Sequence, residues 1–484
     1  MTVPKEIKSI VSELKKQGFE AYAVGGCVRD LLRGKEPEDW DIATNAKPEE
    51  IQKIMEKSGR KTFYENEFWT VGVVWKKEII EITTYRAEAK YTDKRHPDEI
   101  RPAKSLEEDL ARRDFTINAM AADVSGRKTK IVDPFNGQKD LENKIIRAVG
   151  VPKDRFSEDA LRMMRGIRFA SVLGFTIEPE TLKSIGESSL LLKMISQERI
   201  RDESMKIIMS DNAAEGFDLL RKAGLLKYIL PELEEGFGNS QNKHHIYDCY
   251  QHSLFSLKYA AKKKFNKFVR VASLLHDIGK PRSKRGEGPD ATFYGHEIIG
   301  AKMTNEILNR LKFPKKEIEK ITNLVRYHLF YYNAGEVSES SVRRLVRNAG
   351  PENMEELLQV RMADRIGSGV PKAEPYKLRH LKYVIEKVSQ DPISAKMLKI
   401  SGNDVMKILG IKPGPKVGQI LDILLGEVLA DPKRNKKEVL EKQAEKLGGL
   451  SDKELDKIAK ESKEERNEIE TKRDEMTKNK YWVT

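Results

Sequence analysis

The 484-residue sequence has few cysteines and no long apolar run, and both absences narrow the classes of protein it can be. Its two cysteines, Cys27 and Cys249, lie far apart and in no CxxC pair. A disulfide framework or a thiolate zinc site is therefore not expected. No stretch approaches the roughly 18 apolar residues of a membrane helix. The first residues also lack the apolar core of a signal peptide. We therefore expect a cytoplasmic protein with no membrane partner.

Charged residues, by contrast, are abundant, and the positive ones outnumber the negative ones. The net charge is +13 and the pI is near 9.2. This balance suits a polyanionic partner, although charge alone does not distinguish RNA, DNA and a membrane surface. The tail from Asp431 carries 15 Lys/Arg and 14 Asp/Glu. Because it is nearly neutral, the pattern predicts a solvated helical segment rather than a basic RNA-binding arm.

The chain changes character near residue 155. Before that point, Ala21 to Val24 is typical of a short strand, and Val71–Trp75 with Glu78–Thr84 is typical of a hairpin. Beyond it, the apolar pattern predicts helices of 10 to 20 residues separated by glycine and proline. The length favours several domains. We find no convincing internal repeat.

The first candidate chemistry lies in 24-VGGCVRDLLRGKEPEDWDIAT-44. Gly25-Gly26 after a strand lets the backbone approach phosphates closely, and Arg29 can pair with a triphosphate oxygen. Asp39 and Asp41 are two apart, a spacing that on a strand points both carboxylates to one face. Two such carboxylates can hold Mg²⁺ against an incoming triphosphate.

A third carboxylate, Glu81, lies on the second strand of the predicted hairpin between Ile80 and Ile82. Alternation along the strand places it opposite the two isoleucines. The competing interpretation is a salt bridge at a strand edge. Glycine pairs and D-x-D triplets are also common in ordinary loops, so the order of the whole set carries the argument.

This segment resembles the signature of the class II tRNA nucleotidyltransferases and bacterial poly(A) polymerases. Three further stretches are similar to that family in order: 83-TTYRAEAKYTDKRHPDEI-100 to its flexible loop, 112-RRDFTINAMA-121 to its next motif, and 158-EDALRMMRGIRFA-170 to its nucleobase-reading helix. The resemblance is strong over about residues 20 to 230. It implies a nucleotide pocket lined, besides Gly25, Gly26 and Arg29, by Arg112, Arg113, Asp114, Asn118, Glu158, Asp159, Arg162, Arg165 and Arg168.

Asp159 and Arg162 also suggest how a base is chosen. Three apart in a helical stretch, they share a face. Cytosine and adenine each present an amino donor beside a ring-nitrogen acceptor, which a carboxylate and a guanidinium complement; uracil and guanine present the reverse. The competing interpretation is an exposed ion pair. Glu158 near the helix start either holds Arg162 or caps the helix.

A second set of residues resembles the HD phosphohydrolase superfamily. It comprises His252, His276, Asp277, His296, His328 and Asp364, with flanks 251-QHSL, 274-LLHDIGK, 295-GHEIIGA and 325-VRYHL. Helices bearing these ligands can converge on one or two divalent metals and activate water. The sequence does not identify the metal, and the ligands do not define a substrate. The alternative is that these residues only pack in the interior and bind no metal.

We therefore predict an α+β nucleotidyltransferase head with a small mixed sheet, followed by an elongated, mostly α-helical neck, an HD-like body and a tail. The expected parts are a head over 1–150, a neck over 151–240, an HD-like domain over 241–370, and a helical C-terminal body and tail over 371–484. Residues 400–430 resemble the tRNA-contacting portion of some of these enzymes, with an RNA-free helix pair as the equal alternative.

The predicted reaction is addition of CCA to tRNA from CTP and ATP, with release of pyrophosphate. Asp39 and Asp41 would bind Mg²⁺, and Glu81 would assist or act as base. Rivals with the same chemistry are a poly(A) polymerase and an enzyme that adds only CC or only A. The D-x-x-R pair favours a C/A pocket, and the loop from Tyr85 to Pro97 favours complete CCA. Other classes are a metal-dependent phosphohydrolase with an RNA-binding head, and a non-catalytic RNA-binding protein.

Overall fold

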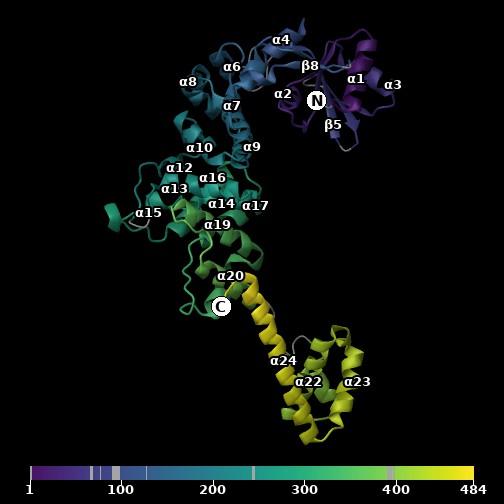
Figure 1. Ribbon diagram of the computed structural model, residues 1–484, viewed down its shortest axis with the longest axis vertical. Helices are drawn as coiled ribbons and strands as arrows, with labels where there is room; N and C mark the ends of the chain where they lie inside the picture. Colours follow the sequence, from purple (N-terminus) through teal and green to yellow (C-terminus); the bar gives the residue numbers. More distant parts are fainter. Residues whose placement is uncertain are drawn as a thin grey trace. The chain divides into compact units, whose positions relative to one another are not determined.

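The computed structural model describes residues 3–65, 69–76, 78–89, 99–126, 128–242, 246–389, 395 and 398–483. The chain, drawn in Figure 1, divides into two compact units, each with most of its residue contacts inside itself. The first comprises residues 1–329 and 355–373, and the second comprises residues 330–354 and 374–484. In the part of the chain that is described, no helix is both long and apolar enough to cross a membrane.

The first unit begins with a sheet of seven strands in the order β3-β4-β5-β2-β1-β8-β9. The strands are β1 (Ala21–Val24), β2 (Asp41–Thr44), β3 (Thr62–Glu65), β4 (Thr70–Trp75), β5 (Glu78–Thr84), β8 (Ala121–Asp123) and β9 (Lys130–Val132). β2 and β5 pair in parallel, whereas the other neighbours pair antiparallel. The sheet is therefore mixed, as expected, and the predicted hairpin is β4–β5.

Helices of this region are α1 (Lys5–Lys16), α2 (Gly26–Leu32), α3 (Pro48–Lys57), α4 (Leu106–Ala111) and α5 (Gly137–Glu142), with a 3-10 turn, η1 (Thr116–Asn118). α1 buries Ile7, Ile10, Val11 and Leu14, the apolar stripe of an amphipathic helix. A short ribbon joins β6 (Arg86–Ala89) to β7 (Glu99–Pro102). Residues 90–98 of the expected flexible loop lie outside the described residues.

The rest of the first unit is almost entirely helical. The helices that position functional residues are α6 (Pro152–Glu158), α7 (Leu161–Leu173), α9 (Gln197–Ile208), α13 (Cys249–Lys262), α14 (Lys267–Leu275), α16 (His296–Arg310), α17 (Lys315–Tyr327) and α19 (Met354–Gly367). The others are α8 (Pro179–Ser188), α10 (Ala213–Lys222), α11 (Leu226–Ile229), α12 (Pro231–Glu234) and α15 (Lys280–Ser283). α7 packs against α9 and α10, and α14 packs against α13 and α17.

The second unit is built from helices alone in its described part. They are α18 (Glu339–Ala349), α20 (Tyr376–Ser389), α21 (Gly402–Leu409), α22 (Pro415–Ala430), α23 (Lys437–Gly448) and α24 (Asp452–Tyr481). The charged tail is helical, as expected, but it is not wholly solvated. Leu440, Leu447 and Leu455 of α23 and α24 are buried in one apolar cluster with residues of α22.

Candidate active site and metal centre

A large cavity of about 1050 Å³ brings together residues of the sheet region and of α7 and α9. Asp41 opens β2, and its register partner on the parallel strand β5 is Glu81. Asp39 and Asp41 both line this cavity. Glu81 lines an adjoining cavity of about 260 Å³ that also contains Asp41 and Arg113. The three predicted carboxylates therefore gather around the start of β2 and its parallel neighbour β5, in the middle of the sheet.

The strand geometry expected for the D-x-D pair holds for only one member. Asp41 belongs to β2, but Asp39 lies in the bend before the strand begins. Both carboxylates line the same cavity, but strand alternation does not explain why, because Asp39 lies outside the strand. For Glu81 the alternation is as predicted, because Ile80 and Ile82 are buried while Glu81 is exposed.

Gly25 is required by its surroundings. Its φ of 79° is in the left-handed region, and a Cβ atom there would lie 2.8 Å from a guanidinium nitrogen of Arg113 and 3.7 Å from Asp41. The turn therefore lets Arg113 approach the carboxylate. Burial raises the pKa of Asp41, Arg113 opposes that rise, and Asp39 adds to it. A site that raises a carboxyl pKa by burial favours a cation close to it.

Four predicted nucleotide-binding residues form one polar network. Arg29 donates to the Asn118 side-chain oxygen at 2.9 Å, and Asn118 donates to Asp114 at 3.2 Å. Arg165 donates to the other oxygen of Asp114 at 2.7 Å. Burial acts to raise the pKa of Asp114, but Arg165, Asn118 and Arg162 together outweigh it, and the pKa falls to about 2. Asp114 therefore stays ionised, and it holds Arg165 directly and Arg29 through Asn118 at the cavity wall.

The remaining arginines are held by buried acids. Arg112 pairs with Asp109 at 3.0 Å, and Arg113 contacts the same carboxylate at 3.4 Å. Arg168 pairs with Glu203 at 3.3 Å and stacks over Phe169, with 4.0 Å between the guanidinium carbon and the ring centroid. These arginines line the large cavity. The cavity is consequently rich in positive charge, which suits a triphosphate.

The predicted base-reading pair lies at this cavity, but not on one helical face. Asp159 adopts an extended conformation between α6 and α7, so the helix is broken there. Asp159 pairs with Arg199 at 2.9 Å, and Arg162 pairs with Glu158 at 2.5 Å. The expectation of a shared helical face is wrong, and the simple i,i+3 ion pair is not formed either.

Asp159 and Arg162 are each held by contacts that the sequence alone did not reveal. Arg162 is buried and donates to the Arg112 carbonyl oxygen at 3.0 Å. Glu158 ends α6 instead of starting a helix, so of its two expected roles only holding Arg162 fits. Arg199 of α9 was not predicted. Its only sequence signal is its place in 198-ERIRDESMK-206, where Glu203 and Lys206 also follow at helical spacing.

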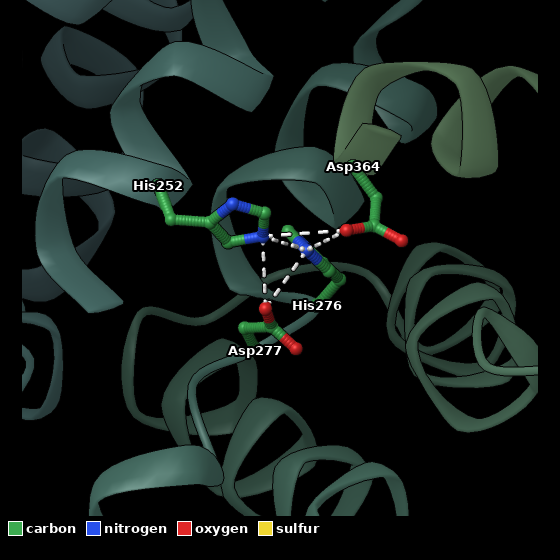
Figure 2. A group of neighbouring side chains, drawn as sticks. All are labelled: His252, His276, Asp277 and Asp364. Carbon is green, nitrogen blue, oxygen red and sulfur yellow. Dashed lines mark hydrogen bonds and ion pairs between the residues drawn. The ribbon is translucent and has the colours of Figure 1, made fainter. Parts of the chain in front are cut away.

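The second predicted set converges in the interior of the first unit. His252, His276, Asp277 and Asp364 point toward one another from α13, the end of α14 and α19 (Figure 2). The His252 Nε2 atom lies 2.9 Å from Asp277 Oδ2 and 3.4 Å from Asp364 Oδ1. The other oxygen of Asp277 lies 3.3 Å from His296 Nε2 and 3.6 Å from His328 Nε2. All six side chains are buried.

Backbone carbonyls orient three of the four imidazoles. The Nδ1 atoms of His276, His296 and His328 lie 2.9, 2.8 and 2.7 Å from the carbonyl oxygens of Ser273, Phe293 and Val325. A carbonyl oxygen only accepts, so each Nδ1 carries the hydrogen and each Nε2 is turned to the carboxylates. This arrangement is typical of metal-ligating histidines.

The carboxylates of this centre dominate its electrostatics. Burial acts to lower the pKa of His276, but Asp277 and Asp364 raise it to about 10. Burial lowers the pKa of His328. Lys280 lies 2.7 Å from Asp277, and Arg361 lies 2.6 Å from Asp364. Lys280 stands within the quoted 274-LLHDIGK stretch, whereas Arg361 had no signal beyond its spacing of three from Asp364.

Family models match three segments of the chain. They describe a poly A polymerase head domain over residues 21–147, a probable RNA and SrmB-binding site of polymerase A over 174–237, and a tRNA nucleotidyltransferase domain 2 over 298–444. The matches follow the order of motifs in the sequence. They fit a nucleotidyltransferase whose sheet-bearing region comes first.

Curated relatives match almost the whole chain. A CCA-adding enzyme of Ligilactobacillus salivarius is 35% identical over 458 residues, which are 92% of this chain and 98% of the relative. An A-adding tRNA nucleotidyltransferase of Deinococcus radiodurans is 33% identical, covering 84% and 92%. The crystal structure of the Bacillus stearothermophilus CCA-adding enzyme in complex with CTP is similar with a TM-score of 0.59 at 29% identity, covering 92% of this chain and 98% of that one.

Fold, cavity and comparisons together define a template-independent type of nucleotidyltransferase, with carboxylates at the central strands β2 and β5 of a mixed sheet and a basic cavity beside them. The chain belongs to the class II tRNA nucleotidyltransferase family, which includes the CCA-adding enzymes.

Proposed function

We propose that this protein completes the 3′ end of tRNA by adding CCA from CTP and ATP without a nucleic-acid template. The RNA 3′-hydroxyl attacks the α-phosphorus of the nucleotide, a new phosphodiester bond forms, and pyrophosphate leaves. The observation that carries this proposal is the single cavity that holds both Asp41 and the Asp159/Arg162 pair. Chemistry and base choice then occur at one site. We place this activity in the cytoplasm.

Asp39 and Asp41 would hold Mg²⁺, which fits two carboxylates side by side, one of them with a pKa raised by burial. When bound, the ion neutralises charge on the triphosphate and on the reacting oxygens. Arg29, Arg113 and Arg165 bind the phosphates through charge-assisted hydrogen bonds. We assign to Glu81, the register partner of Asp41 on β5, the role of accepting the proton of the attacking hydroxyl.

Base choice is assigned to Asp159 and Arg162. Asp159 accepts a hydrogen bond from the amino group of cytosine or adenine, and Arg162 donates one to the adjacent ring nitrogen. With uracil or guanine the same atoms would face donor to donor and acceptor to acceptor. Each such buried mismatch costs about 1–3 kcal/mol. Glu158 and Arg199 hold the two reading side chains in place.

The experiment uses two tRNA transcripts, one ending before CCA and one ending in CC, each incubated with one labelled nucleotide at a time. We expect CMP on the first and AMP on the second, and complete CCA when both nucleotides are present. Addition of AMP only to the transcript ending in CC would instead assign an A-adding enzyme. That alternative has support from the 33% identity to the Deinococcus radiodurans enzyme. Long A tracts would assign a poly(A) polymerase.

A second proposed property is a divalent metal at the six-residue His/Asp centre, with a phosphohydrolase activity of its own. The convergence of Nε2 atoms and carboxylate oxygens within hydrogen-bond distances supports it. The metal is not identified. Metal content of the purified protein tests the site, and release of phosphate from a phosphate ester tests the activity. If the purified protein contains no metal and releases no phosphate but still adds nucleotides, this second property is wrong and the nucleotide addition is unaffected.

A further inference from the structure

An aromatic side chain shares one face of the sheet with the proposed catalytic carboxylates. Cross-strand register places Phe63 of β3, Gly72 of β4, Glu81 of β5 and Asp41 of β2 in one row. Residues paired on neighbouring strands point to the same side of a sheet, so the Phe63 ring and the two carboxylates lie on one side of it. The other side is the packed one, since intervening positions such as Ile80 are buried.

The Phe63 ring lies flat on the sheet over Gly72. A Cβ atom at Gly72 would lie 2.2 Å from Phe63 Cζ and 2.6 Å from each of the neighbouring ring carbons, Cε1 and Cε2. With ordinary aromatic bond lengths, such a point lies on the line through Cζ perpendicular to the ring. One face of the ring therefore covers the Gly72 backbone, and the other face points away from the sheet. Phe63 remains 38% exposed.

Two exposed aliphatic side chains extend this surface. Val74 and Ile79 are register partners on β4 and β5, two residues from Gly72 and Glu81, and they therefore share the face of the Phe63 ring. They are 43% and 52% exposed. Covering a strand glycine with an aromatic ring stabilises a sheet, but that role does not account for the two exposed neighbours. Exposed apolar side chains that gather beside charged groups are typical of a binding surface.

The Phe63 platform, defined as Phe63, Val74 and Ile79, lies beyond Glu81 as seen from the nucleotide cavity. The described residues that line the two active-site cavities include Asp41 and Glu81 but no member of the platform. Neighbouring strands are about 4.8 Å apart, so the ring end over Gly72 lies one strand spacing from Glu81. The order along the row is thus nucleotide site, proposed base Glu81, aromatic ring.

This order matches the order of groups in the proposed reaction. The RNA hydroxyl that loses its proton to Glu81 belongs to the last nucleotide of the RNA, and the base of that nucleotide is joined to the same sugar. With the incoming nucleotide on the Asp41 side, the RNA base is left on the side of the platform. The surface is therefore continuous with the place that the RNA end must occupy.

The chemistry of the platform suits a base whose identity varies. Every nucleobase has a flat π face, so stacking on an aromatic ring accepts all four bases. The RNA end changes at each step of the proposed reaction, from the nucleotide before CCA to C and then to CC. A site for that end must hold different bases, whereas Asp159 and Arg162 select the incoming base by hydrogen bonds. An apolar ring meets the first requirement.

We propose that the Phe63 platform is the subsite for the last base of the RNA that is being extended. The base stacks on the outer face of the Phe63 ring, and this contact holds the 3′-hydroxyl at Glu81. The inference rests on the nucleotide addition proposed above. It adds to that function the position of the RNA end and the residue that fixes this end without reading its sequence.

The test compares two RNA ends on the wild-type protein and on Phe63→Leu. Both RNAs are tRNAs that end before CCA, and they differ only in that the last nucleotide of one lacks its base. On the intact RNA, Phe63→Leu should lower kcat/KM for tRNA about tenfold and leave the KM for CTP unchanged. Loss of the base should cost the wild type a similar factor and Phe63→Leu nothing further, because both changes remove one contact.

Two further variants serve as controls. Phe63→Tyr keeps the flat ring and should behave as wild type with both RNAs. Tyr64→Leu is the matched control, because Tyr64 is the next residue of β3 and faces the opposite side of the sheet, in register with the buried Val71. It should keep wild-type addition to the intact RNA and lose about tenfold when the base is absent.

Three results would overturn the platform: wild-type addition by Phe63→Leu, losses from Phe63→Leu and base removal that multiply, or equal extension of the two RNAs by the wild-type protein. The last is read without any variant, so misfolding of Phe63→Leu leaves the test decisive. Failure of the wild type to add CMP to either RNA would instead remove the proposed function, and the platform with it.

Discussion

At the scale of single residues, each of the two side chains proposed to read the base is held by a neighbour. Arg162 is held by Glu158 and by the Arg112 carbonyl oxygen, and Asp159 is held by Arg199. Exchanging Asp159 and Arg162 would therefore place an arginine against Arg199 and an aspartate against Glu158. Two like-charge contacts at a partly buried site would destabilise the region before any inverted selectivity could be measured.

A milder substitution tests base choice more cleanly. Asp159→Asn keeps the size of the side chain but adds a donor, which can pair with the carbonyl oxygen of uracil. We expect the preference for CTP over UTP to fall roughly tenfold. Ratios of kcat/KM for all four nucleotides measure this. Asp154→Asn, an exposed change on the preceding helix α6, is the control. An unchanged order of preference would move base reading away from Asp159.

Arg199 is predicted to act as a positioning residue through Asp159. Arg199→Ala removes the 2.9 Å ion pair and should lower discrimination among nucleotides about as much as Asp159→Asn does. Because both changes act through one contact, the double variant should be no worse than either alone. Arg201→Ala is the matched control, since Arg201 lies on the same helix α9 and pairs instead with Asp202. Additive losses would contradict this coupling.

Asp114 provides a prediction in pH. Its pKa is about 2, below the ordinary value of 3.8, because Arg165 and Asn118 hold the ionised form. A lowered pKa contributes stability above the ordinary value, and that contribution is lost as pH falls toward 2. Asp114→Asn should therefore lower the free energy of unfolding by about 2 kcal/mol above pH 4. Denaturant unfolding from pH 6 downward should show the gap closing below pH 4, and a constant gap would contradict it.

At the scale of secondary-structure elements, the sequence predicted those whose signal is local. Alternation between Ile80 and Ile82 and the turn at Lys76 made the β4–β5 hairpin predictable, and β1 was predicted with its observed bounds. The parallel pairing of β2 with β5 was not predictable, because it joins distant segments and has no local signal. It is this pairing that places Glu81 beside Asp41.

Between α6 and α7, by contrast, the sequence predicted a continuous helix that the structure interrupts. Residues 158–170 contain no proline, so the sequence pattern predicts one continuous helix there. The structure ends α6 at Glu158 and starts α7 at Leu161, and Asp159 bonds to the Leu161 N–H and to Arg199 instead. A side chain that bonds to a backbone N–H just ahead of it competes with helix continuation. Tertiary contact with α9 decides the outcome.

Metal removal tests the helices that surround the His/Asp centre. The six residues of this centre come from α13, α16 and α19 and from the ends of α14 and α17, so metal bound by its two ligand groups, which together contain all six, would tie these five helices together. A ligand present at 100 times its dissociation constant contributes about 2.7 kcal/mol to stability. Chelation should lower the unfolding temperature by about 5 °C. Scanning calorimetry measures this, and His276→Ala/Asp277→Ala should abolish the response to chelator. An equal response in that variant would place the structural metal elsewhere.

At the scale of the whole molecule, the chain crosses between its two compact units three times. Residues 330–354 fold with the C-terminal helices, whereas α19 returns to the first unit and supplies Asp364 to the His/Asp centre. α24 packs against both α20 and α22, and Leu455 joins the buried cluster of the second unit. A truncation before α24 would therefore remove part of a core as well as a charged tail.

Chemistry and RNA binding should be separable across the molecule, because they rest on different groups. Nucleotide transfer is proposed to need the carboxylates at β2 and β5, whereas we expect an RNA polyanion to be held mainly by contacts of a +13 chain with phosphates. Asp39→Ala or Asp41→Ala should abolish addition of CMP and AMP together and change tRNA affinity less than about threefold at fixed salt. Glu78→Ala, an exposed change at the start of β5, should retain addition.

Salt dependence makes this prediction quantitative. Between 50 and 200 mM salt, tRNA affinity should fall at least about tenfold, with the same logarithmic slope in wild type and in Asp41→Ala, because the slope counts phosphate contacts that the substitution leaves in place. Fluorescence anisotropy with labelled tRNA gives the slopes, and single-turnover extension gives the activity. A changed slope would mean that Asp41 also organises the RNA-binding surface, and wild-type extension by either aspartate variant would remove the proposed catalytic carboxylates.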